Sequence, residues 1–133
     1  MLTPNIDTAP IGGLNNQFFT LTQSSRVVFH TTIAVQNGNS NQFPGPVSVW
    51  LTAEIKNPSG IMVARSVAEA VIAAGGEVYT IVAVGIGTLP PGTYHTSVTM
   101  NRGANGSALR VFDAGYAIHP TQGGQLIIEI FPD

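Results

Sequence analysis

The sequence predicts an all-β protein, an antiparallel β-sandwich of about eight to ten strands. Two observations lead to this class. Stretches of alternating apolar and polar residues recur at roughly 10-residue spacing, and clusters rich in Gly, Pro, Asn and Ser separate them. No stretch has a convincing helical period. Strands without helices to cover them bury their apolar faces by packing one sheet against another.

Length and composition set the outer limits. The 133 residues fit one domain, 1–133, in which residues 1–13 are expected to form an irregular N-terminal arm. Charged residues make up only 9% of the chain, against about 25% in typical soluble domains. The net charge is −2 without a basic cluster, so we expect no nucleic-acid partner. No apolar run approaches the ~20 residues of a membrane-spanning helix, so no membrane insertion is expected.

The chain start, MLTPNIDTAP, lacks the basic and apolar regions of a signal peptide. For an extracellular or particle-surface protein, which is the location we favour, two routes stay open. The chain was cut from a longer precursor, or it was released as part of a particle such as a virion. The absence of cysteine excludes a disulfide framework and thiolate chemistry but fits any compartment.

Two strands are expected in the first third of the chain. The first is short, residues 17–22, with Phe18 and Phe19 on opposite faces. The second covers residues 26–36 and alternates regularly. Its predicted buried face consists of Val27, Phe29, Thr31, Ile33 and Val35. A long polar loop, 37–46, follows it.

The cleanest alternation lies in residues 47–56, and it predicts a strand with one buried face. That face consists of Val47, Val49, Leu51, Ala53 and Ile55. Residues 57–60, Asn-Pro-Ser-Gly, have the composition of a type I turn. Residues 61–72 are expected to return as a strand, although their AEAVIAA end also has helical propensity.

Residues 77–102 are expected to form a hairpin in the middle of the sandwich. Both faces of the first strand are largely apolar: Val82, Val84 and Ile86 alternate with Ile81 and Ala83. Because a strand with one wet face alternates apolar with polar residues, we expect this strand to be covered on both sides. Pro91 and Gly92 fit the two central positions of a type II turn.

Two further strands close the predicted fold. Residues 108–119 are expected to form a strand with a kink at Gly115, after the GANGS turn. Residues 125–131 form the last strand, which is apolar on both faces apart from Glu129.

The order of these elements resembles the jelly roll shared by tumour necrosis factor and the globular head of complement subcomponent q, particularly its bacterial and phage relatives. The resemblance rests on the FFTLT and RVVFHTTIAVQ strands, the TLPPGTYHTSV segment and the last strand, GQLIIEIFPD. It spans most of the chain and concerns strand order, not a catalytic signature. It implies a TNF-like jelly roll that assembles as a homotrimer. The low charge and two-sided apolar strands favour the trimer independently, because a monomer would expose a large apolar patch. The alternative is a monomer whose second sheet covers those faces.

Catalysis is not expected. His30, His95 and His119 lie on three different predicted strands, and no pair has metal-ligand spacing. A single histidine would supply three ligands around a threefold axis, but a hydrogen-bonded or surface histidine is the commoner case. The carboxylates are scattered: Glu54, Glu69, Glu77, Asp113 and Glu129. We therefore predict a protein that is not an enzyme, with no metal site and no cofactor.

Binding is the better expectation. Trp50, the only tryptophan, lies on the outward side of its strand. It either forms a flat platform for a sugar or is buried against another sheet or subunit. Arg102 and Arg110 flank the GANGS turn and, with Asp113, form either a polar cluster that grips hydroxyl groups or a solvated ion pair. The other candidate ligand-binding residues are loop amides: Asn39, Asn41, Gln42 and Asn105.

The function predicted from these features is a trimeric recognition module that binds a glycan or a cell-surface receptor, in the manner of a lectin or adhesin. The alternative is a structural trimer without a small ligand, such as a capsid decoration protein or a surface scaffold. A hydrolase on a jelly-roll frame is a remote third possibility.

Overall fold

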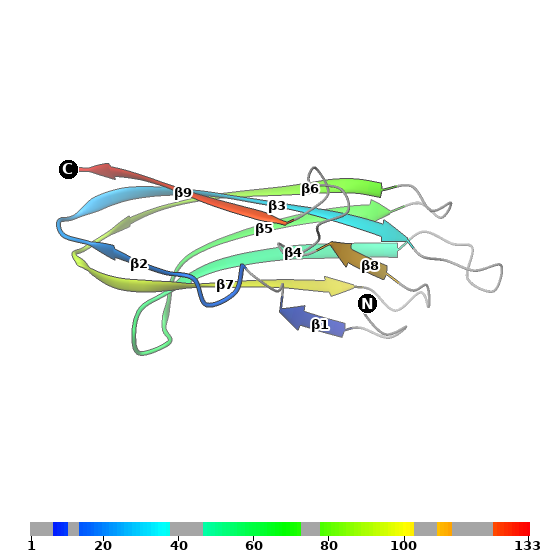
Figure 1. Ribbon diagram of the computed structural model, residues 1–133, viewed down its shortest axis with the longest axis horizontal. Coiled ribbons are helices and arrows are strands. Elements are labelled where there is room, and N and C mark those ends of the chain that lie inside the picture. Colours follow the sequence, from blue (N-terminus) through cyan, green and yellow to red (C-terminus); the bar gives the residue numbers. More distant parts are fainter. Residues whose placement is uncertain (1–6, 11–13, 38–46, 73–77, 103–108, 113–123) are drawn as a thin grey trace.

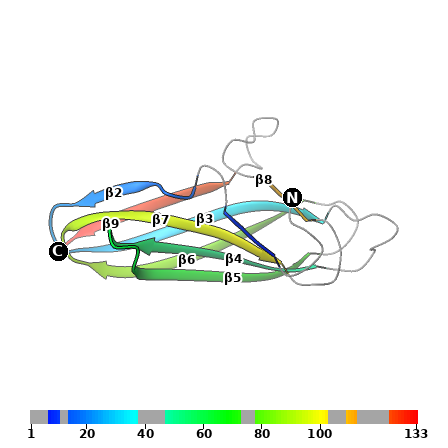
Figure 2. The same ribbon diagram turned by 90° about the horizontal axis from the view of Figure 1, so that it is seen from below.

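Two antiparallel sheets pack face to face in the computed structural model of the chain (Figure 1). The structure describes residues 7–10, 14–37, 47–72, 78–102, 109–112 and 124–133, and side chains within 14–36, 48–72, 79–101 and 124–133. These residues form nine strands and no helix, which confirms the predicted all-β sandwich. The long strands run along the long axis of the molecule in both views (Figures 1 and 2). No helix among the described residues could cross a membrane.

One sheet has five strands, which we call the five-stranded sheet. β1 (Asp7–Pro10) and β2 (Phe18–Leu21) both pair with β7 (Gly92–Arg102). β7 in turn pairs with β4 (Val47–Lys56), and β4 pairs with β5 (Met62–Ile72). Part of the expected irregular arm is therefore a strand, because β1 adds its backbone hydrogen bonds to the far half of β7.

The other sheet has four strands and is called the four-stranded sheet. β6 (Val78–Leu89) pairs along one side of β3 (Ser25–Asn37). On the other side, β8 (Leu109–Phe112) pairs with the end of β3, and β9 (Gln125–Pro132) pairs with its first two-thirds. The sheets meet along β5 and β6, which lie side by side.

The expected central hairpin is wrong in its pairing. β6 and β7 belong to different sheets, and β6 has a described partner on one side only. The Pro91–Gly92 segment therefore carries the chain across the sandwich. It does not close a type II turn, since Gly92 is already part of β7 and has φ of 158°, far from the value near +80° that such a turn requires. The Tyr94 hydroxyl instead fixes this crossing by donating to the Pro90 carbonyl at 2.6 Å.

The sandwich is shown, whereas the jelly-roll connectivity remains a prediction. The spatial order of strands in the five-stranded sheet is β1-β7-β4-β5, and β2 also pairs with β7. The four-stranded sheet runs β6-β3-β8, with β9 also on β3. Sequential strands thus alternate between the sheets at several points, as they do in Greek-key sandwiches.

The core lies between the two sheets, and the predicted alternation identifies its members. The five side chains predicted to face inward on β3 are all at most 1% exposed. On β4, Val49, Leu51, Ala53 and Ile55 are equally buried, whereas Trp50 and its outward neighbours are half-buried. The core is finished by side chains from the remaining strands, with Tyr94, Val98, Met100, Ile72, Ile81 and Leu89 among them.

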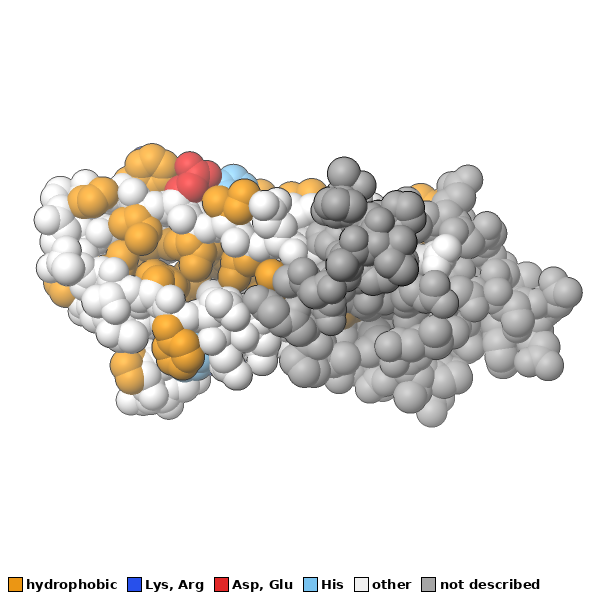
Figure 3. Space-filling model, viewed as in Figure 1, with side chains coloured by type: hydrophobic (Ala, Val, Ile, Leu, Met, Phe, Trp, Pro, Cys, Tyr) orange, Lys and Arg blue, Asp and Glu red, His pale blue; other side chains and the backbone are white. Residues whose placement is uncertain are grey.

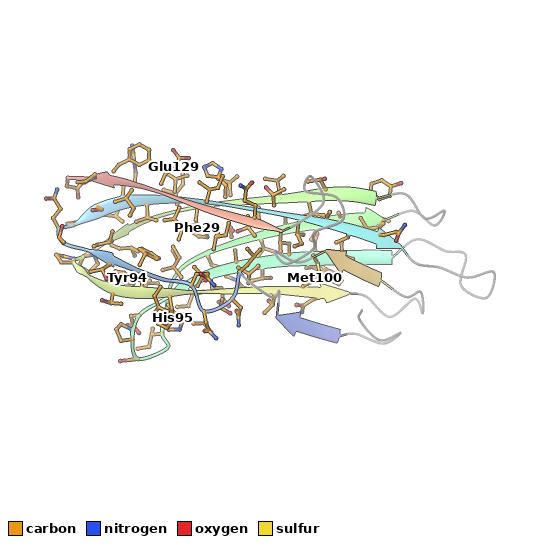
Figure 4. All side chains as sticks on the ribbon, viewed as in Figure 1. Phe29, Tyr94, His95, Met100 and Glu129 are labelled. Atoms are coloured by element: carbon orange, nitrogen blue, oxygen red, sulfur yellow. The ribbon has the colours of Figure 1, made fainter. Side chains whose placement is uncertain are left out.

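The Phe29 ring occupies the space that a side chain at position 85 would need. A Cβ added at Gly85, its partner in the β3–β6 register, would overlap the Phe29 ring. The inner face of β6 therefore has a gap in its side chains that Phe29 fills. Figure 4 shows Phe29 between the layers.

The β4–β5 connection confirms the predicted turn. Gly60 N–H donates to the Asn57 carbonyl at 2.9 Å, as in a type I turn. The Asn57 Oδ1 atom accepts two more backbone N–H groups, from Ser59 and Ile61, each at 3.0 Å. Gly60 adopts φ of +80°. The segment 61–72 is a strand, so the pairing of β5 with β4 overrides its helical propensity.

The last third is described only in part. β8 covers four residues of the expected strand 108–119, and its predicted kink at Gly115 lies outside the described residues. β9 matches the expected closing strand. Asp133 ties the end of β9 to the β2–β3 turn, since its N–H donates to the Ser24 carbonyl at 3.0 Å.

Candidate functional site

The outer face of the five-stranded sheet is mostly polar around β4 and β7. Register pairs on this face bring Thr52 beside Thr99 and Glu54 beside Ser97. These four side chains are half-buried. Because the opposite faces of the same strands form the core, alternation leaves every second residue of β4 and β7 on this polar face.

Trp50 is the large aromatic side chain of β4 on this face, and Phe18 of β2 lies on the same face opposite His95 of β7. Trp50 stands between Glu69 of β5 and Asn101 of β7 in the sheet register. Its indole Nε1 donates a hydrogen bond to Glu69 Oε1. The predicted outward orientation of Trp50 is confirmed, and within this chain the second sheet does not cover it.

A shallow depression of about 340 Å³ adjoins this pair. It is open to solvent and lies where β4 and β5 run together. Its lining residues come from those two strands: Ser48, Val49, Trp50, Glu69, Ala70 and Val71. The depression thus combines an indole, a carboxylate and small side chains on a rigid pair of strands.

This arrangement suits a neutral polar ligand. An indole provides a flat apolar surface for the C–H groups of a ligand, and its hydrogen bond to Glu69 holds the ring in one orientation. The carboxylate has acceptor positions beyond the one used by the indole, and these can receive hydroxyl protons. Two elements, an apolar platform and a fixed acceptor, are the usual components of small-ligand sites.

The structure separates the other predicted site residues. Arg102 ends β7 in the five-stranded sheet, and Arg110 lies in β8 of the four-stranded sheet, so the two do not face each other across one hairpin. The remaining candidates lie outside the described residues: Asn39, Asn41, Gln42, Asn105 and Asp113. Of the predicted set, Trp50 is the one whose side chain the structure describes.

Sequence reasoning missed Glu69 as the partner of Trp50. The signal was available, because the Asn57–Gly60 turn fixes which residues of β4 and β5 lie opposite one another. Counting outward from that turn requires allowance for the register shift between Ile55 and Lys56. With that shift, Trp50 pairs with Glu69.

A second surface has a different character. The outer face of the four-stranded sheet carries exposed apolar side chains from β6 and β9, flanking the half-buried outward side chains of β3. We call this the apolar face, and its members are Val28, Val82, Val84, Ile86, Ile127 and Phe131. The expectation that β6 is covered on both sides is therefore not met within one chain, because Val82, Val84 and Ile86 are 52–65% exposed.

The apolar face contains one ion pair. His30 Nε2 lies 2.7 Å from Glu129 Oε1, between β3 and β9. Figure 4 shows Glu129 on the outward side of β9, and Figure 3 shows hydrophobic atoms around the acidic and histidine side chains there. At one end of the face, the Arg26 guanidinium lies 5.3 Å from the centre of the Phe131 ring. Alternation alone does not indicate the β3–β9 register that creates these contacts.

The other histidines have separate surroundings. His95 on β7 lies against Phe18, with ring centres 5.6 Å apart. His119 is outside the described residues. Among the side chains that are described, no three His, Asp or Glu residues gather as metal ligands would.

Comparisons with known proteins add no relative. No family model matches the chain, and neither a curated protein nor a solved structure matches it. The two outer sheet faces are therefore the features of the chain from which a function can be inferred.

Proposed function

We propose that this protein is a non-enzymatic trimeric recognition module that binds a neutral polyhydroxyl ligand, such as a glycan, at the Trp50–Glu69 depression. The observation that carries the proposal is the outward Trp50 indole held by Glu69 beside an open depression. A sugar stacks its C–H face on the indole, and its hydroxyls donate to the free acceptor positions of Glu69.

The strength expected of one site is low. Each hydrogen bond contributes only about 0.5–1.5 kcal/mol net, and the depression is open rather than enclosed. Three sites in one trimer would compensate, because linked sites can raise avidity ~100-fold or more. The trimer is the assembly that the resemblance implies, and the exposed apolar face supports it.

A glycan array followed by titration of the best ligand tests this function. We expect Trp50→Ala to weaken binding at least about tenfold, equivalent to about 1.4 kcal/mol. Glu54→Gln is the matched control, because Glu54 lies on the same strand and face outside the depression. It should bind as the native protein does.

The predicted loop residues provide a further comparison. If Asn41→Ala or Arg110→Ala abolishes binding while Trp50→Ala leaves it unchanged, the ligand site lies at the loops and not at the depression. Light scattering on each variant checks that the oligomer is intact. An array without any ligand would contradict glycan recognition.

The exposed apolar face favours a second candidate function, a structural trimer without a small ligand. A face of this kind supports assembly but makes no use of Trp50. An intact trimer that binds nothing on the array, and in which Trp50→Ala has no effect, would favour this structural role.

A further inference from the structure

The Trp50–Glu69 depression offers a ligand more hydrogen-bond acceptors than donors. Trp50 has a single N–H group, and it already donates to Glu69 Oε1, so the indole has no donor left for a ligand. The Glu69 carboxylate accepts hydrogen bonds and cannot donate one. Of the side chains that line the depression, only the Ser48 hydroxyl can still donate. A ligand group placed against Glu69 must therefore bring its own proton.

Glu69 is also the one charged residue in the lining of the depression. Its row of the sheet continues with two neutral residues, Trp50 and Asn101. On the β4–β5 hairpin, Arg65 stands opposite Glu54, four positions along β5 from Glu69. Four residues of a strand span about 13 Å, which exceeds the Debye length of about 8 Å at physiological ionic strength. Within the described part of the chain, Glu69 belongs to no ion pair, and its charge is not compensated at the site.

These two properties distinguish neutral from acidic glycans. A sugar hydroxyl both donates and accepts, so it can turn its proton toward Glu69. A carboxylate or sulfate group on a sugar has acceptor oxygens alone. Placed at the same point, it would form no hydrogen bond with Glu69 and would be repelled by the like charge. The indole does not discriminate in this way, because its flat surface accepts the C–H groups of either kind of sugar.

We propose that Glu69 determines the charge selectivity of the Trp50 depression, which accepts hydroxyl groups beside Glu69 and rejects carboxylate and sulfate groups there. The inference rests on the proposed glycan-binding function. It adds the class of ligand that the site excludes and the residue that excludes it. Trp50 then provides the surface on which a sugar stacks, and Glu69 selects among the sugars that can stack.

Glu69→Gln tests this role with little change of shape. The glutamine oxygen can still accept the indole N–H, and the amide NH₂ adds a donor that both hydroxyl and sulfate groups can use. The probes are the best neutral glycan found on the array and its derivatives with one sulfate placed on each hydroxyl in turn. In the native protein, we expect sulfate at one or more positions to weaken binding at least about tenfold. Glu69→Gln should bind those same derivatives within about threefold of the neutral glycan.

Glu54→Gln is the matched control, because it removes the same charge from the same sheet face outside the depression. It should keep the native selectivity. A sulfate that is excluded by its size would stay excluded in Glu69→Gln, and that result would overturn the role of Glu69. Native binding that tolerates sulfate at every position would overturn it as well. In both cases, glycan recognition itself would stand, whereas an array without a neutral ligand would overturn the proposed function.

Fluorescence quenching measures the charge at the site without any glycan, because Trp50 is the only tryptophan of the chain. Iodide and caesium quench an indole with opposite charge preference, and neutral acrylamide corrects for a change in exposure. At constant ionic strength, Glu69→Gln should raise the ratio of the iodide to the caesium quenching constant at least about twofold, and Glu54→Gln, beyond the Debye length, should leave it unchanged. Circular dichroism checks that both variants fold. An unchanged ratio in Glu69→Gln would overturn the proposed selectivity.

Discussion

On β3, alternation determines which side chains are buried, and one of the buried side chains is polar. Thr31 lies in the core between Phe29 and Ile33 on the inner face, and it is fully buried. Its hydroxyl has no hydrogen-bond partner among the described residues. A buried hydroxyl without a partner loses its hydration and gains nothing in return. The regular pattern thus placed a polar group in an apolar layer.

Thr31→Val should therefore stabilise the protein. Valine has nearly the same shape and removes the hydroxyl, so the free energy of unfolding should rise by about 0.5–2 kcal/mol. Urea unfolding followed by tryptophan fluorescence measures the change. Thr32→Val is the control, because Thr32 is on the outward face of the same strand and half-buried, and its effect should be near zero. A loss of stability in Thr31→Val would mean that the hydroxyl has a partner.

At the scale of elements, the β4–β5 hairpin positions the candidate site. The Asn57–Gly60 turn sets the register that brings Glu69 opposite Trp50, so a turn at one end of the hairpin determines the contact farther along it. Gly60 makes this turn possible by adopting φ of +80°, a left-handed conformation that a Cβ disfavours.

Gly60→Ala should lower the free energy of unfolding by about 1 kcal/mol through backbone strain alone, because a Cβ at this position meets no atom within 4 Å. Gly60→Asn should cost less, since asparagine tolerates the left-handed region. Ser59→Ala, at the neighbouring exposed position, is the control for a change in the loop. Urea midpoints of the three variants provide the comparison. Equal losses for alanine and asparagine would argue against a backbone origin.

At the scale of the whole molecule, the sparse charge predicts how the assembly responds to salt. The chain has only five basic and seven acidic residues. We expect the proposed trimer to be held mainly by apolar and neutral polar contacts. Because salt screens charges and leaves apolar contacts largely intact, the trimer should keep its mass from low salt to about 1 M NaCl. Sedimentation or light scattering across that range measures it. A trimer that dissociates in moderate salt would contradict the apolar mechanism but not the trimer.

Alternation along the chain was sufficient to predict the sandwich, most of its strands and the inward faces of β3 and β4. It also placed Trp50 outward and predicted the Asn57–Gly60 turn. These features depend on neighbouring residues, whose geometry is set by the two-residue period of a strand and by local turn chemistry. For the same reason, the resemblance-based jelly roll and trimer remain predictions, since they concern connections and contacts beyond one strand.

Tertiary structure decided which strands became partners. The placement of β6 and β7 in different sheets and the register of β3 with β9 both depend on residues that are distant in sequence. Local pattern carries no information on such pairings, because an alternating strand satisfies its own backbone and apolar face equally well beside several neighbours. The sequence by itself therefore determined the composition of each face. The fold decided that one outer face is polar along β4 and β7 beside exposed valines of β5, and that the other exposes apolar residues around a His–Glu pair.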